Sequence, residues 1–157
     1  MPPMLAALVQ TGVLSLDGKT FSGLDACRSC GSGLAGYDTK ARRFAMVRDE
    51  DGRTREVTVW VKRFACRECG RISPARAPFY PGTRYGSPVV DLCVVLSRRE
   101  TPGKAAALME ELGLVIDRAT VRTYAARDFG TIPVTEIYGL ALPSSIISLT
   151  VLGTRFV

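Results

Sequence analysis

Two motifs, Cys27-Arg28-Ser29-Cys30-Gly31 and Cys66-Arg67-Glu68-Cys69-Gly70, decide the fold of this chain. Each places two thiols two residues apart before a glycine, and 35 residues separate the two pairs. Two intervening residues let one tight turn direct both sulfurs toward one ion, and the glycine can adopt a positive φ that turns backbone N–H groups toward the sulfurs. The motifs predict one closed, structural Zn²⁺ site whose ligands are Cys27, Cys30, Cys66 and Cys69.

The same four cysteines also fit two disulfides, an iron–sulfur cluster or a redox pair. Residues 1–10 lack the basic start of a secretory signal, so we expect a cytoplasmic chain with reduced thiols, which favours zinc. The fifth cysteine, Cys93, lies in the apolar run 89–96 and is expected to be a small buried side chain.

The residues between the motifs predict a β-hairpin. Strands are expected over 42–48 and 56–64, the second with valines at alternate positions. The acidic, glycine-containing segment 49–53 supplies the turn between them. Two cysteine knuckles around a hairpin are the plan of a zinc ribbon, which we place at 27–70.

Composition limits the classes of function. The chain has 157 residues, a net charge of +6 and no histidine. The length suits one or two small domains, and without histidine there is no imidazole base or His-ligated metal centre. Residues 27–86 carry 13 basic and 6 acidic side chains, whereas 87–130 carry six of each. The excess charge therefore lies in the cysteine-bearing segment and favours a polyanionic partner. The uncharged stretch 137–154 is too polar and interrupted to span a membrane, so no membrane partner is expected.

Four basic residues of the hairpin are candidate phosphate contacts: Arg42, Arg43, Lys62 and Arg63. Phe44, Trp60 and Phe64 lie among them, and such a mixture can follow a phosphate backbone and stack on bases. In the alternative, the aromatic side chains pack the inner face of the hairpin and the basic side chains only solvate its outer face.

Three short helices are predicted after a linker rich in proline and arginine at 71–86. The helices are expected over 87–99, 104–112 and 117–129. Their start signals are the N-caps Ser87, Thr101 and Asp117, and Gly113 stops the second helix.

The last two helices and their tight turn have the layout of a helix-turn-helix within 87–130. The outward residues of the final helix are small or basic: Arg118, Ala119, Arg122, Thr123 and Arg127. Such a face suits the major groove of DNA, and Arg127 also lies toward the negative end of the helix dipole. A generic three-helix packing unit is the alternative.

The ends of the chain give weaker signals. Residues 1–26 predict a short helix over 4–10 and a small hairpin over 13–21. Residues 131–157 are expected to form a tail with one strand, over 146–152. We expect this strand either to open a missing domain or, through its free edge, to pair with the ribbon or with a second copy of the chain in a homodimer.

The string KAAALMEELGLVIDRATVRTY, residues 104–124, resembles the helix-turn-helix of bacterial and archaeal insertion-sequence transposases. There a Leu-Gly-aliphatic turn leads through an Asp or Ser cap to a Thr-Val or Thr-Ile pair, and the matching positions here are Gly113, Asp117, Thr120 and Val121. A zinc ribbon around an arginine-rich hairpin often precedes it in that family, so the resemblance covers about 24–129. It implies that Arg118, Arg122 and Thr123 meet base edges and that Thr120 meets a phosphate.

We expect no catalysis. The family continues into an RNase-H-like domain with three acidic residues that bind Mg²⁺, but only Glu136 follows the helices here. A nuclease built on Asp49-Glu50-Asp51 is the enzymatic alternative, although three consecutive acids in a glycine turn usually face solvent.

The expectations combine into one α+β protein, a four-cysteine zinc ribbon followed by a three-helix helix-turn-helix. Its expected partner is double-stranded DNA, and its expected location is the cytoplasm, in association with the nucleoid. The alternatives are a transcriptional regulator of the same build and a zinc-ribbon module that binds another protein.

Overall fold

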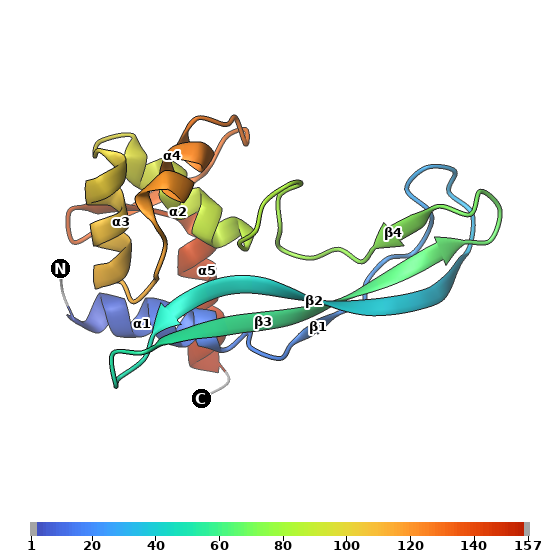
Figure 1. The fold of residues 1–157 in the computed structure, drawn as a ribbon, viewed down its shortest axis with the longest axis horizontal. Coiled ribbons are helices and arrows are strands. Elements are labelled where there is room, and N and C mark those ends of the chain that lie inside the picture. Colours follow the sequence, from blue (N-terminus) through green and yellow to red (C-terminus); the bar gives the residue numbers. More distant parts are fainter. Residues whose placement is uncertain (1–2, 156–157) are drawn as a thin grey trace.

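A long antiparallel hairpin connects the cysteine motifs to the helices. Its strands are β2 (Leu34–Arg48) and β3 (Thr54–Cys66), both longer than the predicted strands. Figure 1 shows the hairpin running from the cysteine-bearing loops at one end of the molecule to a group of helices at the other. This computed structural model describes residues 3–155 and the side chains of residues 3–149.

The hairpin belongs to a sheet of four strands. β1 (Thr20–Phe21) lies parallel to β3, and β4 (Ile72–Pro74) lies antiparallel to the other end of β3. The prediction of a linker without regular structure at 71–86 was therefore wrong at its start, because β4 pairs with Arg63–Ala65.

Within the described residues 3–155, five helices and a second small hairpin accompany the sheet and make the fold α+β, as expected. The helices are α1 (Pro3–Leu14), α2 (Ser87–Ser97), α3 (Pro102–Glu111), α4 (Arg118–Ala125) and α5 (Ser144–Arg155). The second hairpin consists of β5 (Val134–Ile137) and β6 (Leu140–Pro143). No helix in the described part of the chain is long and apolar enough to span a bilayer.

A β-bulge in β2 joins the sheet to the helices. The register shifts between Arg43 and Ala45, so Phe44 departs from the regular ladder and is fully buried. Its carbonyl accepts a 2.8 Å hydrogen bond from the Gly86 N–H, just before α2, and its ring meets the Phe79 ring edge to face at 6.1 Å. Phe44 is therefore a core residue and is not available to stack on bases.

Two of the three predicted helix caps are confirmed. The Thr101 hydroxyl accepts the Lys104 N–H at 3.3 Å, and the Asp117 carboxylate accepts the Thr120 N–H at 3.3 Å. Ser87 is not a cap: it is the first residue of α2, and Gly86 takes the cap position without a side-chain bond. Glycine is required there because a Cβ at residue 86 would overlap the Phe44 ring.

The turn between α3 and α4 is held against the hairpin. Gly113 has φ +86° and ends the turn after α3, as predicted. The Arg48 N–H donates to the Gly113 carbonyl at 3.0 Å, and the Val115 N–H donates to the Met46 carbonyl at 2.8 Å. The last turn of α4 is shorter than expected, since the helix ends at Ala125 and Arg127 lies beyond it.

The predicted hairpin at 13–21 was wrong. Leu5, Val9 and Val13 are buried at a four-residue spacing, so the helical pattern continues through residue 13 and α1 extends to Leu14. The following Asp17 closes the chain onto β3, because its carboxylate accepts the Thr58 N–H at 3.0 Å and an Arg55 N–H at 2.8 Å.

The predicted strand at 146–152 was also wrong, because these residues belong to α5. Ile146 and Leu149 are buried three residues apart, and α5 packs against α1 and α2. Tertiary burial of one helix face thus overrides the strand preference of the β-branched residues. The tail also contains the β5–β6 hairpin, whose turn residues Tyr138 and Gly139 both have positive φ, the geometry of a type I′ turn.

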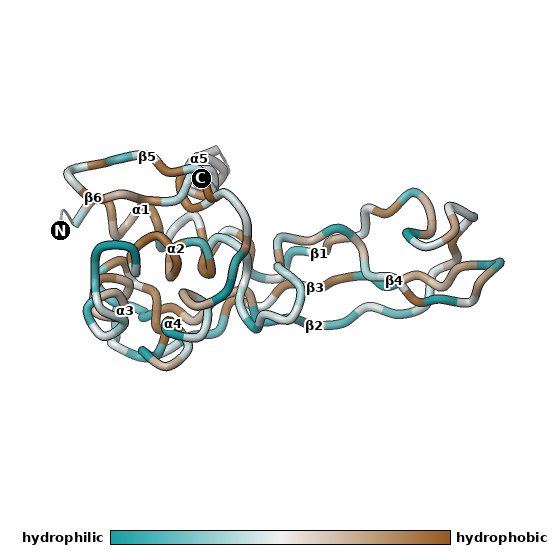
Figure 2. Tube along the Cα trace, turned by 90° about the horizontal axis from the view of Figure 1, so that it is seen from above, coloured by the Kyte–Doolittle hydropathy of each residue, from teal (hydrophilic) through white to brown (hydrophobic). Residues whose placement is uncertain are grey.

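One hydrophobic core occupies the helical end. It draws fully buried residues from α1, α2, α3, α4, β6 and α5 and from the near half of the hairpin. In Figure 2 much of β3 is hydrophobic whereas β2 is mostly hydrophilic. Residues 22–43 and 62–74 contribute no fully buried member to this core, so the far end of the ribbon needs another source of stability.

The Phe44–Gly86 contact predicts a sharp contrast between two glycines. Gly86→Ala should destabilise the protein by about 1–3 kcal/mol, because the added methyl overlaps a buried ring. Gly103→Ala, in α3 with open space around it, should stabilise by about 0.5–1 kcal/mol. Urea denaturation measures both, and equal stability of Gly86→Ala and the wild type would contradict the packing described here.

Asp17 predicts a dependence of stability on acid pH. The Thr58 N–H, followed by Arg55, holds the pKa of Asp17 below its ordinary 3.8. The folded state therefore gains stability from ionised Asp17 above about pH 4, and this gain is lost as the pH falls through the lowered pKa. In urea denaturation at pH 7 and pH 3, Asp17→Asn should show a smaller stability difference than the wild type. The exposed Asp51→Asn should leave the difference unchanged.

Candidate metal centre and basic surfaces

The four predicted ligands converge at the far end of the ribbon. The Sγ atoms of Cys27, Cys30, Cys66 and Cys69 all lie within 4.8 Å of one another. The closest pairs join the two motifs, with 3.7 Å between Cys27 and Cys69 and 3.4 Å between Cys30 and Cys66. A tetrahedral ion bound to sulfur at about 2.3 Å keeps its ligands about 3.8 Å apart. The cluster therefore has the size of a four-thiolate metal site.

The two knuckles are built alike. Gly31 and Gly70 have φ +75° and +74°, as predicted, and donate their N–H groups to the carbonyls of Cys27 and Cys66 at 2.9 and 3.1 Å. Within each turn a further backbone N–H lies 3.4 Å from the first sulfur. Each knuckle thus presents two sulfurs, and the antiparallel pairing of β2 with β3 brings the two knuckles together.

Hydrogen bonds and the neighbouring thiols alter the pKa values of three of the cysteines. Hydrogen bonds from Ser32 lower the pKa of Cys30 to about 6, and the backbone around Cys30 and Ser29 lowers that of Cys27. The Arg71 N–H lowers the pKa of Cys69, but the other thiols and partial burial outweigh it and raise the value to about 11. Four thiols so close together need a cation before all of them ionise.

Cys93 lies outside this cluster and is fully buried, as expected. Its sulfur is 3.7 Å from the Met109 sulfur, and burial raises its pKa to about 12. It is part of the helical core.

The four basic hairpin residues do not form one surface. By the antiparallel register, Arg42 and Arg63 share a face with Val59, whereas Arg43 and Lys62 lie on the opposite face. Arg43 pairs with Glu56 at 3.7 Å, and Arg63 forms an ion pair with Asp38. The Lys62 ammonium lies 5.2 Å from the centre of the Phe64 ring.

Arg42 joins the hairpin to the segment that follows β4. Its guanidinium donates to the Thr83 carbonyl at 2.9 Å and lies 3.9 Å from the centre of the Phe79 ring. Burial lowers its pKa. Arg42 thus has a structural role in addition to any role at a phosphate.

The predicted contacts on α4 differ in exposure. Arg118, Arg122 and Thr123 are exposed on the helix, and the Thr123 hydroxyl donates to the Ala119 carbonyl at 3.0 Å. The Thr120 side chain is only half exposed and bonds the Asp117 carboxylate. Arg127 donates to the carbonyls of Pro81 at 3.0 Å and Gly82 at 3.4 Å.

Three arginines that sequence reasoning missed line the surface between the ribbon and α4: Arg28, Arg76 and Arg84. They come from a cysteine knuckle and from the segment after β4. No local pattern connects them, because only the path of the chain after β4 brings these segments together.

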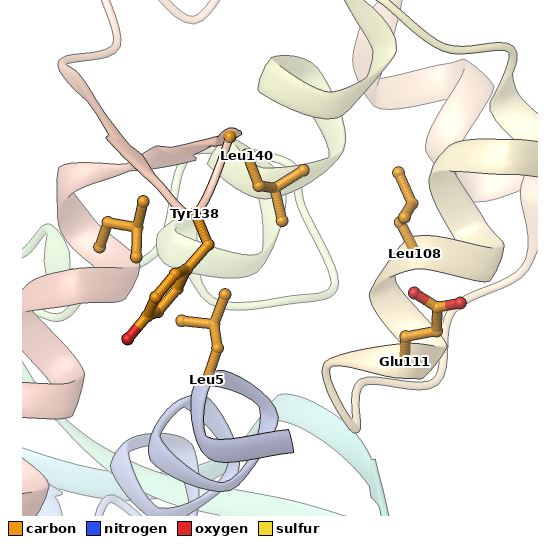
Figure 3. A pocket seen from close by; sticks show the side chains of 7 residues that line it. Leu5, Leu108, Glu111, Tyr138 and Leu140 are labelled. Atoms are coloured by element: carbon orange, nitrogen blue, oxygen red, sulfur yellow. The ribbon is translucent and has the colours of Figure 1, made fainter. Parts of the chain in front are cut away.

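One further hollow and the acidic run 49–51 show no sign of a metal site. An apolar hollow of about 220 Å³ lies between Leu5, Leu108 and Tyr138, with Glu111 as its one charged lining residue (Figure 3). The acidic run 49–51 lies in the hairpin turn, where the Asp49 carboxylate accepts the Arg53 N–H at 2.8 Å. Among the described residues, only the four cysteines converge as a group able to hold a metal ion.

Comparison with known proteins adds no family to these observations. No protein-family model, no curated protein and no solved structure matches the chain.

The sulfur cluster predicts a metal content that depends on position, not on cysteine number. Protein purified under reducing conditions should hold one equivalent of metal by native mass spectrometry. Cys69→Ser should lose it, because three thiolates and a hydroxyl no longer close the site. Cys93→Ala, which removes a buried sulfur from the core, should retain one equivalent while losing about 1 kcal/mol or more of stability. If Cys93→Ala lost the metal while Cys69→Ser retained it, the assignment of the four ligands would be refuted.

Proposed function

We propose that this chain is a zinc-stabilised protein that binds double-stranded DNA, with α4 as its recognition helix. The observation that carries the proposal is the exposed face of α4. It presents Arg118, Arg122 and Thr123 to solvent, and the helix contains no acidic residue. A short helix with small and basic outward residues suits the major groove, where arginine can donate two hydrogen bonds to guanine.

The surroundings of α4 support this role. Val121 and Tyr124 are buried on its inner face, and α4 packs against both α2 and α3. The Asp117 cap fixes the start of the helix, and the Gly113 turn is bonded to the hairpin. We propose that α3, the turn and α4 form a helix-turn-helix whose second helix is held rigidly enough to read bases.

Zinc is the metal that we propose for the sulfur cluster. Four thiolates suit this ion and leave no coordination position open, so the ion would support the ribbon without taking part in chemistry. Because the far end of the ribbon adds no fully buried member to the core, metal binding would supply its folding energy.

We propose a binding role without catalysis. The acidic run 49–51 does not form a metal-binding group with other described residues, and the zinc would be fully coordinated. The similarity of residues 104–124 to transposase recognition segments supports DNA as the partner and remains part of this proposal.

Arg122 gives the direct test of base reading. On a duplex selected from a random pool, Arg122→Ala should weaken binding by about 1–3 kcal/mol and relax the preference at one base position. Arg53→Ala removes an exposed arginine from the hairpin turn and should change neither affinity nor preference. Gel-shift titrations on selected and random duplexes measure both effects.

Salt dependence separates DNA binding from a protein-interaction module. A DNA-binding protein should lose affinity steeply as salt rises, because phosphate contacts release counterions. Wild-type protein that binds no duplex at 50 mM salt would refute the proposed function.

A further inference from the structure

Two hollows meet at one loop between the ribbon and α4. The first, of about 300 Å³, is lined by residues of α4 and by Arg84 and Arg127. The second, of about 400 Å³, is lined by Arg28, Arg42 and Arg76. Gly82 belongs to both linings, so the two hollows adjoin at this loop, and together we call them the path.

The loop between the hollows is held from both sides by arginines. From the α4 side, the Arg127 guanidinium bonds the carbonyls of Pro81 and Gly82. From the sheet side, the Arg42 guanidinium bonds the next carbonyl, that of Thr83. Three successive carbonyls are thereby fixed, and the backbone of Arg84 is held in turn by the Tyr124 hydroxyl at 3.0 Å. The backbone of this loop is therefore fixed before any ligand binds.

Every charged side chain that lines the path is an arginine, so the path is positively charged. No carboxylate lines either hollow. Arg28, Arg76 and Arg84 are exposed and have no ion pair with any described residue. By contrast, Arg43, Arg48, Arg55 and Arg63 each pair with an acidic side chain elsewhere. Guanidinium groups without acidic partners, gathered in a concave path, suit the phosphate oxygens of a polyanion.

We infer that this path binds the phosphodiester backbone of duplex DNA, with Arg28, Arg76 and Arg84 as its phosphate contacts. The inference rests on the proposed function and extends it from the recognition helix to the surface that supplies affinity independent of base sequence. Because one hollow is lined by Ala119, Thr120 and Thr123 of α4, a strand in the path lies beside the groove that α4 enters.

A triple variant tests the path against a control of equal charge. Arg28→Gln/Arg76→Gln/Arg84→Gln removes three positive charges from the path. Arg53→Gln/Arg98→Gln/Arg99→Gln removes three from exposed residues that line neither hollow. Affinity is measured on the selected duplex and on random duplexes between 50 and 200 mM salt, after metal content and thermal unfolding show that both variants are folded.

The path variant should lose affinity on the order of 100-fold at 0.1 M salt, equally on both duplexes. The slope of log affinity against log salt should become shallower by about 3, whereas the control should keep the wild-type slope within about 1. Equal losses in the two triple variants would overturn the path, because net charge alone would then explain binding.

Two further outcomes separate this inference from the proposed function. If Arg122→Ala alters base preference while the path variant binds like the wild type, the path is refuted and the recognition helix stands. Calorimetric titration with inorganic phosphate forms the second arm. Phosphate binding that the path variant loses, together with unchanged duplex affinity, would make this a site for the free anion and overturn the inference.

Discussion

The burial of Phe44 against Gly86 is the contact on which the arrangement of the molecule depends. The β-bulge aims this ring out of the ladder, and the missing side chain at residue 86 lets α2 begin directly beside it. The chain before α2 is then bonded to the same point, since the Gly86 N–H meets the Phe44 carbonyl. Because that chain includes the loop at Gly82, the contact also determines where the basic path lies relative to α4. Side-chain volume at one core position therefore controls the geometry of the adjoining polar surface, which Arg42 and Phe79 line.

The two ends of the hairpin use different sources of stability. The near end shares a hydrophobic core with the helices, in which Val57, Val59 and Val61 of β3 are buried. The far end has backbone pairing with β4 and the four sulfurs, but no fully buried core member. A segment of this kind gains little from apolar burial, so an ion held by the four sulfurs would have the larger effect on its folding.

Local signals in the sequence were sufficient where one turn determines the structure. The two cysteine knuckles, the caps at Thr101 and Asp117 and the stop at Gly113 were all predictable, because each depends on residues within five positions. Tertiary contacts decided the rest. The run 146–152 has strand preference but forms α5, since its burial against α1 and α2 favours a helix. The grouping of basic residues also failed on the hairpin, because a period of two residues sends neighbouring arginines to opposite faces.

The ion pairs explain why the positive charge of the cysteine-bearing segment is a poor guide to its surface. Arg43 and Arg63, which adjoin aromatic residues in the sequence, are neutralised by Glu56 and Asp38 across the hairpin. No sequence pattern singles out Arg28, Arg76 and Arg84, but their charges are not compensated, because none of them forms an ion pair with an acidic side chain among the described residues. Paired surface charges contribute little to a long-range field, whereas unpaired charges in a hollow are concentrated by its low-dielectric walls. The electrostatic surface of this protein is therefore determined by the positions of its acids, and the path beside α4 is basic because its lining contains none.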